Sequence, residues 1–206
     1  MKRCVIFVGG DPVSESTPDR ELIASSFVIA ADIGYVSCEM FGIRADVIIG
    51  DFDSAQMPDA GNIERFPIEK DDPDIMLAIK RAIADGCDDI TVYGGTGGRL
   101  DHTVSNIQSL AYCYERGIKC RIVSDNERAE LLPPGRYEMP YMEGFSLSLF
   151  AYGGEVTGLD IWGCKYSGEC YSLTPSFPLG VSNSVTQKSA GISFESGCLL
   201  CIRSRL

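Results

Sequence analysis

Two aspartates stand close together after a short apolar run in the first half of the chain. In the segment IIGDFDS, Asp51 and Asp53 are two residues apart, so their carboxylates lie on the same side of an extended chain. Such a pair can share a hard cation such as Mg²⁺, which proteins commonly hold with one or two carboxylates together with substrate phosphates. Aspartates that cap turns in a solvated loop give the same pattern. The pair alone leaves both interpretations open.

Further acidic residues also follow apolar runs. Asp32 comes after FVIAA, and Asp71, Asp72 and Asp74 come after ERFPIEK. The carboxyl ends of parallel strands meet at one edge of a sheet, where like charges repel unless a metal compensates them. We interpret Asp72 as a helix cap and Asp71 as an exposed residue. Asp74 is less easily explained in this way, and the pattern as a whole predicts a divalent cation among these carboxylates.

A glycine-rich segment, VYGGTGGRLDH, leads from a predicted strand into a predicted helix. Backbone N–H groups at Gly97 and Gly98 could approach a phosphate closely, and Arg99 offers a forked donor for its oxygens. The segment lacks the GK[ST] of a Walker loop and the GxGxxG of a dinucleotide site. An ordinary tight turn fits it equally well, and Arg99 could simply pair with Asp101. We interpret His102, the single histidine, as structural.

The elements that must position these residues alternate along residues 1–125. Short apolar runs predict strands, and the longer amphipathic stretches between several of them predict helices. This alternation is typical of an α/β domain with a mainly parallel sheet. The predicted strands are CVIFVG, FVIAAD, DVIIGD, ITVYG and CRIVSD.

Two helices are marked by their ends. The first runs over 73–85, with Asp72 as its N-cap, Pro73 at its first position and Gly86 as its terminator. The second runs over 100–116 and ends at Gly117. Its predicted buried stripe consists of Val104, Ile107, Ala111 and Tyr114.

After residue 125 the pattern changes to short alternating runs separated by Gly, Pro, Ser and Asn. We expect an all-β sandwich there, and place the domains at 1–128 and 129–206. On their own, Ser182 and Asn183 are typical of a turn, and Trp162 and Tyr166 of core aromatics.

Composition limits the classes of function. The chain has 206 residues, of which 45% are hydrophobic, enough for a substantial core, and its net charge is −11. That charge argues against binding to nucleic acid or to an anionic membrane surface. No apolar stretch approaches the roughly 20 residues that cross a bilayer. The nine scattered cysteines predict reduced thiols, with Cys198 and Cys201 in a buried strand rather than a zinc site. We expect a soluble, cytoplasmic enzyme.

In chain order, the motifs ADIGY, FGIRADVIIGDFDS, KDDPD, GGTGGRLDHTVSN, GCKYSG and GVSNS resemble the thiamine pyrophosphokinase family, from residue 30 to the end. The resemblance implies an N-terminal α/β domain that binds nucleotide and Mg²⁺, a C-terminal β-sandwich that binds thiamine, and a homodimer. It also implies transfer of pyrophosphate from ATP to the hydroxyl of thiamine, which gives thiamine diphosphate and AMP.

The resemblance also assigns roles by position. It implies that the metal ligands are Asp32, Asp51, Asp53 and Asp74, and that the catalytic residues are Asp51, Asp53, Asp74 and Asp101. The implied ATP contacts are Lys70, Gly97, Gly98, Arg99 and Asp101, and the implied thiamine contacts are Ser182, Asn183, Trp162 and Tyr166. Two residues depart from the family pattern: Ile33 replaces a usual glycine, and Pro73 a usual threonine.

Two other functions remain compatible with the sequence. One is a different reaction on the same scaffold, such as a Mg²⁺-dependent phosphohydrolase or a small-alcohol kinase. The other is a non-catalytic sensor of nucleotide or thiamine, which the changes at Ile33 and Pro73 keep open.

Overall fold

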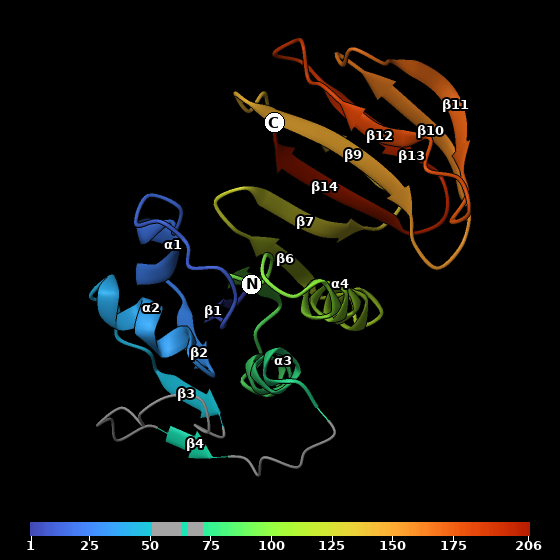
Figure 1. Cartoon of the computed structure of the whole chain (residues 1–206). Helices are drawn as coiled ribbons and strands as arrows, with labels where there is room; N and C mark the ends of the chain where they lie inside the picture. The colour runs from blue at the N-terminus through green and yellow to red at the C-terminus, as the bar shows by residue number, and fades with distance from the viewer. Residues whose placement is uncertain (51–62, 66–71) are drawn as a thin grey trace. The chain divides into compact units, whose positions relative to one another are not determined.

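The computed structural model of the chain describes residues 1–50, 63–65 and 72–206 (Figure 1). It divides into two compact units, Met1–Asp125 and Asn126–Leu206. No helix in the described part of the chain is long and apolar enough to cross a membrane.

The first unit is built on a parallel sheet with strand order β6-β5-β1-β2-β3-β4, and every pairing within it is parallel. The strands are β1 (Arg3–Phe7), β2 (Phe27–Ala31), β3 (Val47–Gly50), β4 (Ile63–Arg65), β5 (Asp89–Tyr93) and β6 (Lys119–Val123). The helices are α1 (Arg20–Ala24), α2 (Gly34–Met40), α3 (Asp74–Ala84) and α4 (Leu100–Tyr114). The α/β class and its mainly parallel sheet are as predicted.

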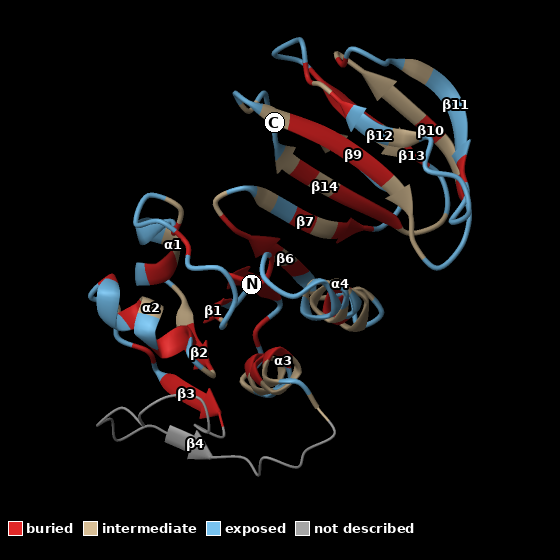
Figure 2. Cartoon of the chain, in the orientation of Figure 1, coloured by how far each residue is buried: buried red, intermediate tan, exposed pale blue. Residues whose placement is uncertain are grey.

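The sheet is covered on both faces, which explains why its strands are continuous apolar runs rather than alternating ones. Figure 2 shows β1, β2 and β3 as buried. Val5 and Phe7 share a core with residues of α1 and α2. The intervening Ile6 points to the other face, because successive side chains of a strand alternate. Helices α3 and α4 lie against that face (Figure 1).

Helix α3 begins one residue later than predicted. Pro73 is its N-cap, and its carbonyl accepts hydrogen bonds from the N–H groups of Met76 and Leu77 at 2.9 and 3.1 Å. The prediction that Asp72 caps the helix was therefore wrong. The Asp72 carboxylate instead accepts a 2.6 Å hydrogen bond from the side chain of Lys80, which lies within α3. Asp74 becomes the first helical residue, where the helix dipole favours a carboxylate.

Helix α4 lies where it was predicted, but its most buried face is not the predicted apolar stripe, of which Ile107, Ala111 and Tyr114 are only half-buried. Val104 is 49% exposed, whereas Ser109, Leu110 and Cys113 are buried. The buried face contains the polar Ser109 and is flanked by the half-buried Asn106, and hydrophobic periodicity cannot identify a face with such residues. Asn106 is held there because its side-chain amide donates a 2.8 Å hydrogen bond to the carbonyl of Gly95.

All regular elements of Asn126–Leu206, a range that the structure describes completely, are strands. They are β7 (Glu127–Leu132), β8 (Gly135–Glu138), β9 (Phe145–Ala151), β10 (Val156–Trp162), β11 (Gly168–Leu173), β12 (Gly180–Asn183), β13 (Gly191–Phe194) and β14 (Leu199–Arg205). One antiparallel sheet has the order β7-β14-β9-β12 and the other β8-β13-β10-β11. Leu149 and Leu199 of the first share one core with Leu159 and Ile192 of the second. The unit is therefore a β-sandwich, as predicted.

The nine cysteines are free thiols, and seven of them are buried. Burial raises the pKa of Cys38 and of Cys201 to about 12, because the thiolate would lose its hydration. These thiols are protonated and unreactive at neutral pH. Cys201 lies in the sandwich core, as expected from the apolar sequence around it.

Candidate functional site

The topology of the first unit creates a crevice at the carboxyl ends of β1 and β5. These strands are neighbours, but β1 leads through α1 to β2 on one side, and β5 leads through α4 to β6 on the other. The two connections leave in opposite directions, and open α/β sheets bind ligands at such a switch point. The loops that follow the two strands, residues 8–19 and 94–99, therefore form the first place to look for a site.

A cavity of about 150 Å³ lies between these loops. Its lining is dominated by glycine and short polar residues: Gly9, Gly10, Gly94, Gly95, Thr96, Gly97, Gly98, Arg99, His102, Thr103 and Asn106. The loops touch directly, since a Cβ atom on Gly10 would lie 1.9 Å from the carbonyl oxygen of Gly94. Such a lining leaves backbone N–H groups accessible to an anion.

Gly97 is required for two reasons. Its φ of +89° is in the region that other residues rarely adopt. A Cβ atom on it would also lie 2.0 Å from Oδ2 of Asp11, in the opposing loop. Asp11 thus places a carboxylate directly against the glycine loop.

Arg99 and Asp101 form a two-pronged ion pair at the start of α4. Nε of Arg99 donates to Oδ1 of Asp101 at 3.1 Å, and an Nη donates to Oδ2 at 2.5 Å. The hydrogen bonds from Arg99 lower the pKa of the Asp101 carboxyl, and the carboxylate raises the pKa of Arg99. Both side chains are largely exposed, so the pair adds little to stability, and the Arg99 guanidinium remains accessible from solvent.

Of the four predicted metal ligands, the structure describes Asp32 and Asp74; Asp51 and Asp53 lie outside the described residues, as does Lys70. Asp32 follows β2 with a φ of +50°, and its Oδ2 would be 3.4 Å from a Cβ atom on Gly9. It therefore lies beside the cavity. Across residues 1–50, 63–65 and 72–206, no group of three or more Asp, Glu, His or Cys side chains could hold a metal ion.

Ile33, one of the two departures from the family pattern, lies directly after Asp32. It is the N-cap of α2 and makes no side-chain capping hydrogen bond, but its carbonyl accepts from the N–H of Val36 at 3.0 Å. Its side chain is 38% exposed and contacts the Gly9 position. The bulk of Ile33 is thus accommodated by a glycine in the adjacent loop.

In the second unit the structure brings Asn183, Ser182 and Tyr166 together. Oδ1 of Asn183 accepts from the N–H of Tyr166 at 2.9 Å, and its amide donates to the Tyr166 carbonyl at 2.8 Å. Asn183 is buried by these contacts, while the ring of Tyr166 is 59% exposed. Ser182 has a φ of +58° and an exposed side chain. Asn183 therefore fixes the turn, and Tyr166 and Ser182 have their side chains exposed beside it.

Trp162 has a different environment within the same unit. The guanidinium of Arg136 lies 4.0 Å from the centre of its ring, a cation–π arrangement. Its ring also packs on Gly191, where a Cβ atom would be 2.3 Å from the indole. The indole already contacts one cation, so a ligand cation would compete with Arg136 for that face.

Gly9, Gly10, Thr96 and Asn106 line the cavity but were not predicted as site residues. The pair Gly9-Gly10 directly after the first strand was an available signal, because glycines at that position permit close backbone approach. Asn106 gave no signal of its own, since it lies inside a helix.

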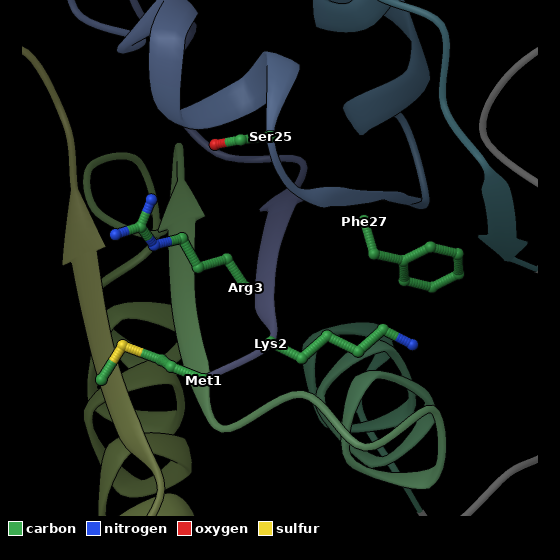
Figure 3. A pocket seen from close by; sticks show the side chains of 5 residues that line it. All are labelled: Met1, Lys2, Arg3, Ser25 and Phe27. Atoms are coloured by element: carbon green, nitrogen blue, oxygen red, sulfur yellow. The ribbon is translucent and has the colours of Figure 1, made fainter.

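A larger hollow of about 360 Å³ lies elsewhere in the first unit, at the amino ends of β1 and β2 (Figure 3). Figure 3 shows Met1, Lys2, Arg3, Ser25 and Phe27 around it. Of its two cationic side chains, Lys2 is bonded to the carbonyl of Asp85 at 2.6 Å and Arg3 lies 4.0 Å from the carboxylate of Asp89. Open α/β sheets bind their ligands at the carboxyl ends of the strands, so this hollow at the amino ends is not the expected site.

The chain matches two family models. Residues 19–122 match "Thiamin pyrophosphokinase, catalytic domain", and residues 136–199 match "Thiamin pyrophosphokinase, vitamin B1 binding domain". The thiamine pyrophosphokinase of Bacillus subtilis strain 168 is 31% identical over 184 residues, which cover 85% of this chain and 86% of the relative.

Solved structures give the same result. A thiamine pyrophosphokinase from Bacillus subtilis superposes with a TM-score of 0.88 at 27% identity, with full coverage of both chains. One from Geobacillus thermodenitrificans has a TM-score of 0.82 at 25% identity and covers 100% of this chain and 98% of that one. The enzyme from Candida albicans, at 17% identity and a TM-score of 0.80, supports the fold alone.

Proposed function

The chain belongs to the thiamin pyrophosphokinase family, and from this premise we propose which of its residues carry out the reaction. The enzyme transfers pyrophosphate from ATP to the hydroxyl of thiamine, giving thiamine diphosphate and AMP. The observation that carries this function is that one chain matches both the catalytic and the vitamin B1 binding models. A phosphohydrolase, another small-alcohol kinase or a sensor is not favoured by that combination.

The proposed ATP site is the cavity at the switch point. Its glycine loop offers the N–H groups of Gly97 and Gly98, and Arg99 at the start of α4 offers a forked donor. Lys70 completes the proposed set of cations. On binding, Arg99 exchanges Asp101 for a phosphate oxygen, and its charge then neutralises the negative charge that develops during transfer.

We place Mg²⁺ at Asp32, Asp51, Asp53 and Asp74. The donor set suits it, because all four are carboxylates and Asp32 follows a parallel strand beside the cavity. When bound, the ion neutralises charge on the triphosphate and so assists departure of AMP. The role of Asp51 and Asp53 is inferred from their sequence position.

We assign thiamine binding to the second unit, at the turn of Ser182 and Asn183. Tyr166 presents an exposed ring suited to the thiazolium cation, and Asn183 holds the backbone that carries this ring. Trp162 would contact thiamine only if Arg136 moved away from the indole ring that it now covers.

The chemistry is an in-line displacement. The thiamine hydroxyl oxygen forms a bond to the β-phosphorus of ATP, and the bond from that phosphorus to the α–β bridging oxygen breaks. The hydroxyl proton goes to a carboxylate, for which Asp74 and Asp101 are the candidates. Arg99 lowers the pKa of Asp101 only while the two side chains are paired, so this shift does not decide between the two carboxylates once Arg99 has moved to a phosphate oxygen.

We also propose a homodimer in the cytoplasm. Phe177, Leu179 and Val181 are 64%, 53% and 45% exposed in and before the edge strand β12, an apolar surface that a second copy would cover. Nine free thiols fit a reducing compartment.

The deciding experiment measures AMP formed by the purified protein from ATP and MgCl₂, with and without thiamine, and with EDTA as a control. The expected result is AMP whose formation depends on thiamine and is abolished by EDTA, together with thiamine diphosphate identified by its mass.

Asp51→Asn and Asp53→Asn should reduce turnover at least about a hundredfold while leaving the thermal transition unchanged. The matched control Asp88→Asn, at the amino end of β5, should retain activity. Turnover near wild type in Asp51→Asn would contradict the metal assignment.

A further inference from the structure

The end of β6 holds both loops that form the proposed ATP cavity. Ser124 and Asp125 directly follow this strand, and Asp125 is the last residue of the first unit. The hydroxyl of Thr96, in the glycine loop, donates a 2.8 Å hydrogen bond to the hydroxyl of Ser124. Both residues are buried, so this contact ties the glycine loop to the end of β6.

Asp125 holds the other loop, residues 8–19. The N–H of Ser14 donates to both carboxylate oxygens of Asp125 at 2.9 Å, and the Ser14 hydroxyl donates to Oδ1 at 3.1 Å. The hydroxyl of Thr17 donates to Oδ1 as well. A single side chain thus accepts hydrogen bonds from the backbone and from two hydroxyls of one loop, and bonds to an ionised acceptor are stronger than neutral ones.

This loop needs such an anchor. It contains Gly9 and Gly10, which line the cavity, and it has no regular secondary structure before α1. Its direct bond to the glycine loop, from the N–H of Asp11 to the carbonyl of Thr96, is long at 3.4 Å. Ordering a free backbone costs conformational entropy at each residue, so a loop without an anchor samples many arrangements.

We propose that Asp125 is a positioning residue for the nucleotide: it keeps Gly9 and Gly10 in the arrangement that completes the cavity, without touching ATP itself. This inference rests on the proposed function, since it takes the cavity as the ATP site. The affinity of a protein for its ligand falls in proportion to the fraction of its conformers that remains competent to bind. Loss of Asp125 therefore weakens nucleotide binding selectively and leaves thiamine recognition, which belongs to the other unit, unchanged.

The test compares Asp125→Ala and Asp125→Asn in the full-length chain. The readouts are the dissociation constant of the α,β-methylene analogue of ATP with MgCl₂, by calorimetry, and the KM for ATP and for thiamine. If the competent population falls to about one fifth, Asp125→Ala weakens analogue binding about fivefold. Asp125→Asn keeps one acceptor oxygen and should lie between Ala and wild type. The KM for thiamine should not change in either variant.

Asp46→Asn is the matched control. Its carboxylate also accepts a backbone hydrogen bond, 2.8 Å from the N–H of Val28, but at the opposite end of the sheet. If Asp46→Asn weakens analogue binding as much as Asp125→Ala does, or if Asp125→Ala binds like wild type, the inference is wrong. Should Asp125→Ala fail to fold, Ser14→Ala removes one of the same hydrogen bonds from the loop side and should show the same selective loss. A wild-type protein that does not bind the analogue would overturn the proposed ATP site itself.

Discussion

At the scale of single residues, glycines, which have no side chain, shape the cavity as much as the side chains that line it. Gly10 lets its loop reach the backbone of Gly94, and Gly97 leaves room for the carboxylate of Asp11. The charged groups at the rim, Arg99 and Asp101, are paired with each other and largely exposed. Phosphate binding at such a site depends first on backbone geometry and then on exchange of an ion-pair partner.

Replacing Gly97 should affect both stability and nucleotide binding. In Gly97→Ala we expect a loss of about 1–3 kcal/mol in the free energy of unfolding, because alanine is strained at φ > 0. We also expect at least about tenfold weaker binding of the ATP analogue, because a methyl group would displace Asp11 and the loop. Urea unfolding and calorimetric titration measure the two effects.

Gly117→Ala is the matched control for that variant. Gly117 has a φ of +68° but nothing within 4 Å of its Cβ position, and it lies beyond the far end of α4. The Gly117→Ala variant should lose a similar amount of unfolding free energy and should bind the ATP analogue as tightly as the wild type. Equal affinity in the two variants would show that Gly97 has no special role in binding. The double variant Gly97→Ala/Asp11→Ala should recover part of the affinity, because it removes the two closest atoms, Oδ2 and Cγ of Asp11. The Cβ atom of residue 11, at 2.8 Å from the Cβ position of residue 97, and the backbone strain both remain.

At the scale of elements, side-chain amides fix the loops that strands and helices leave open. Asn106 of α4 holds the glycine loop through the carbonyl of Gly95, and Asn183 of β12 holds the turn of Tyr166 through both backbone groups. Both asparagines connect a regular element to a segment without regular structure. Asn106 therefore ties one proposed ligand contact to a helix, and Asn183 ties the other to a strand.

Replacing these two asparagines should raise the KM for different substrates. Asn183→Ala leaves backbone groups of Tyr166 without their partners, so the free energy of unfolding should fall by about 1–3 kcal/mol. The KM for thiamine should rise several-fold while the KM for ATP stays unchanged. Asn106→Ala should raise the KM for ATP and leave that for thiamine. Steady-state kinetics with each substrate varied in turn distinguish the two, and parallel changes in both constants would contradict separate roles.

At the scale of the whole molecule, the chain combines a covered parallel sheet with a sandwich that has open edges. Strand β12 lies at the edge of its sheet, and the segment that leads into it exposes Phe177 and Leu179. Exposed apolar residues at a sheet edge invite association unless they are covered. The proposed homodimer covers them.

The dimer is tested by Phe177→Asp. A charge placed in a buried apolar interface remains unpaired, so the variant should elute as a monomer where the wild type elutes with twice the mass of the chain. Light scattering coupled to gel filtration gives the masses. Met40→Asp is the control, since Met40 is 62% exposed on α2, and it should leave the mass unchanged. A monomeric wild-type protein would refute the proposed dimer.

The sequence alone determined the fold class and the family. The five strands that it predicts in the first half are all present, because a strand covered on both faces must be a continuous apolar run, which is visible without a structure. The motif GGTGGRLDH located the glycine loop for a similar reason: backbone positions at φ > 0 favour glycine, and glycine is visible in the sequence.

The tertiary structure alone decided which residues lie opposite one another. The buried face of α4 could not be predicted because it contains the polar Ser109 and is flanked by the half-buried Asn106, whose position depends on a carbonyl of another segment. Asp125 and Ser14 are far apart in sequence, and neither carries a motif. Contacts of this kind arise from the strand order, which places the ends of β1, β5 and β6 side by side, and no local pattern of residue types encodes that order.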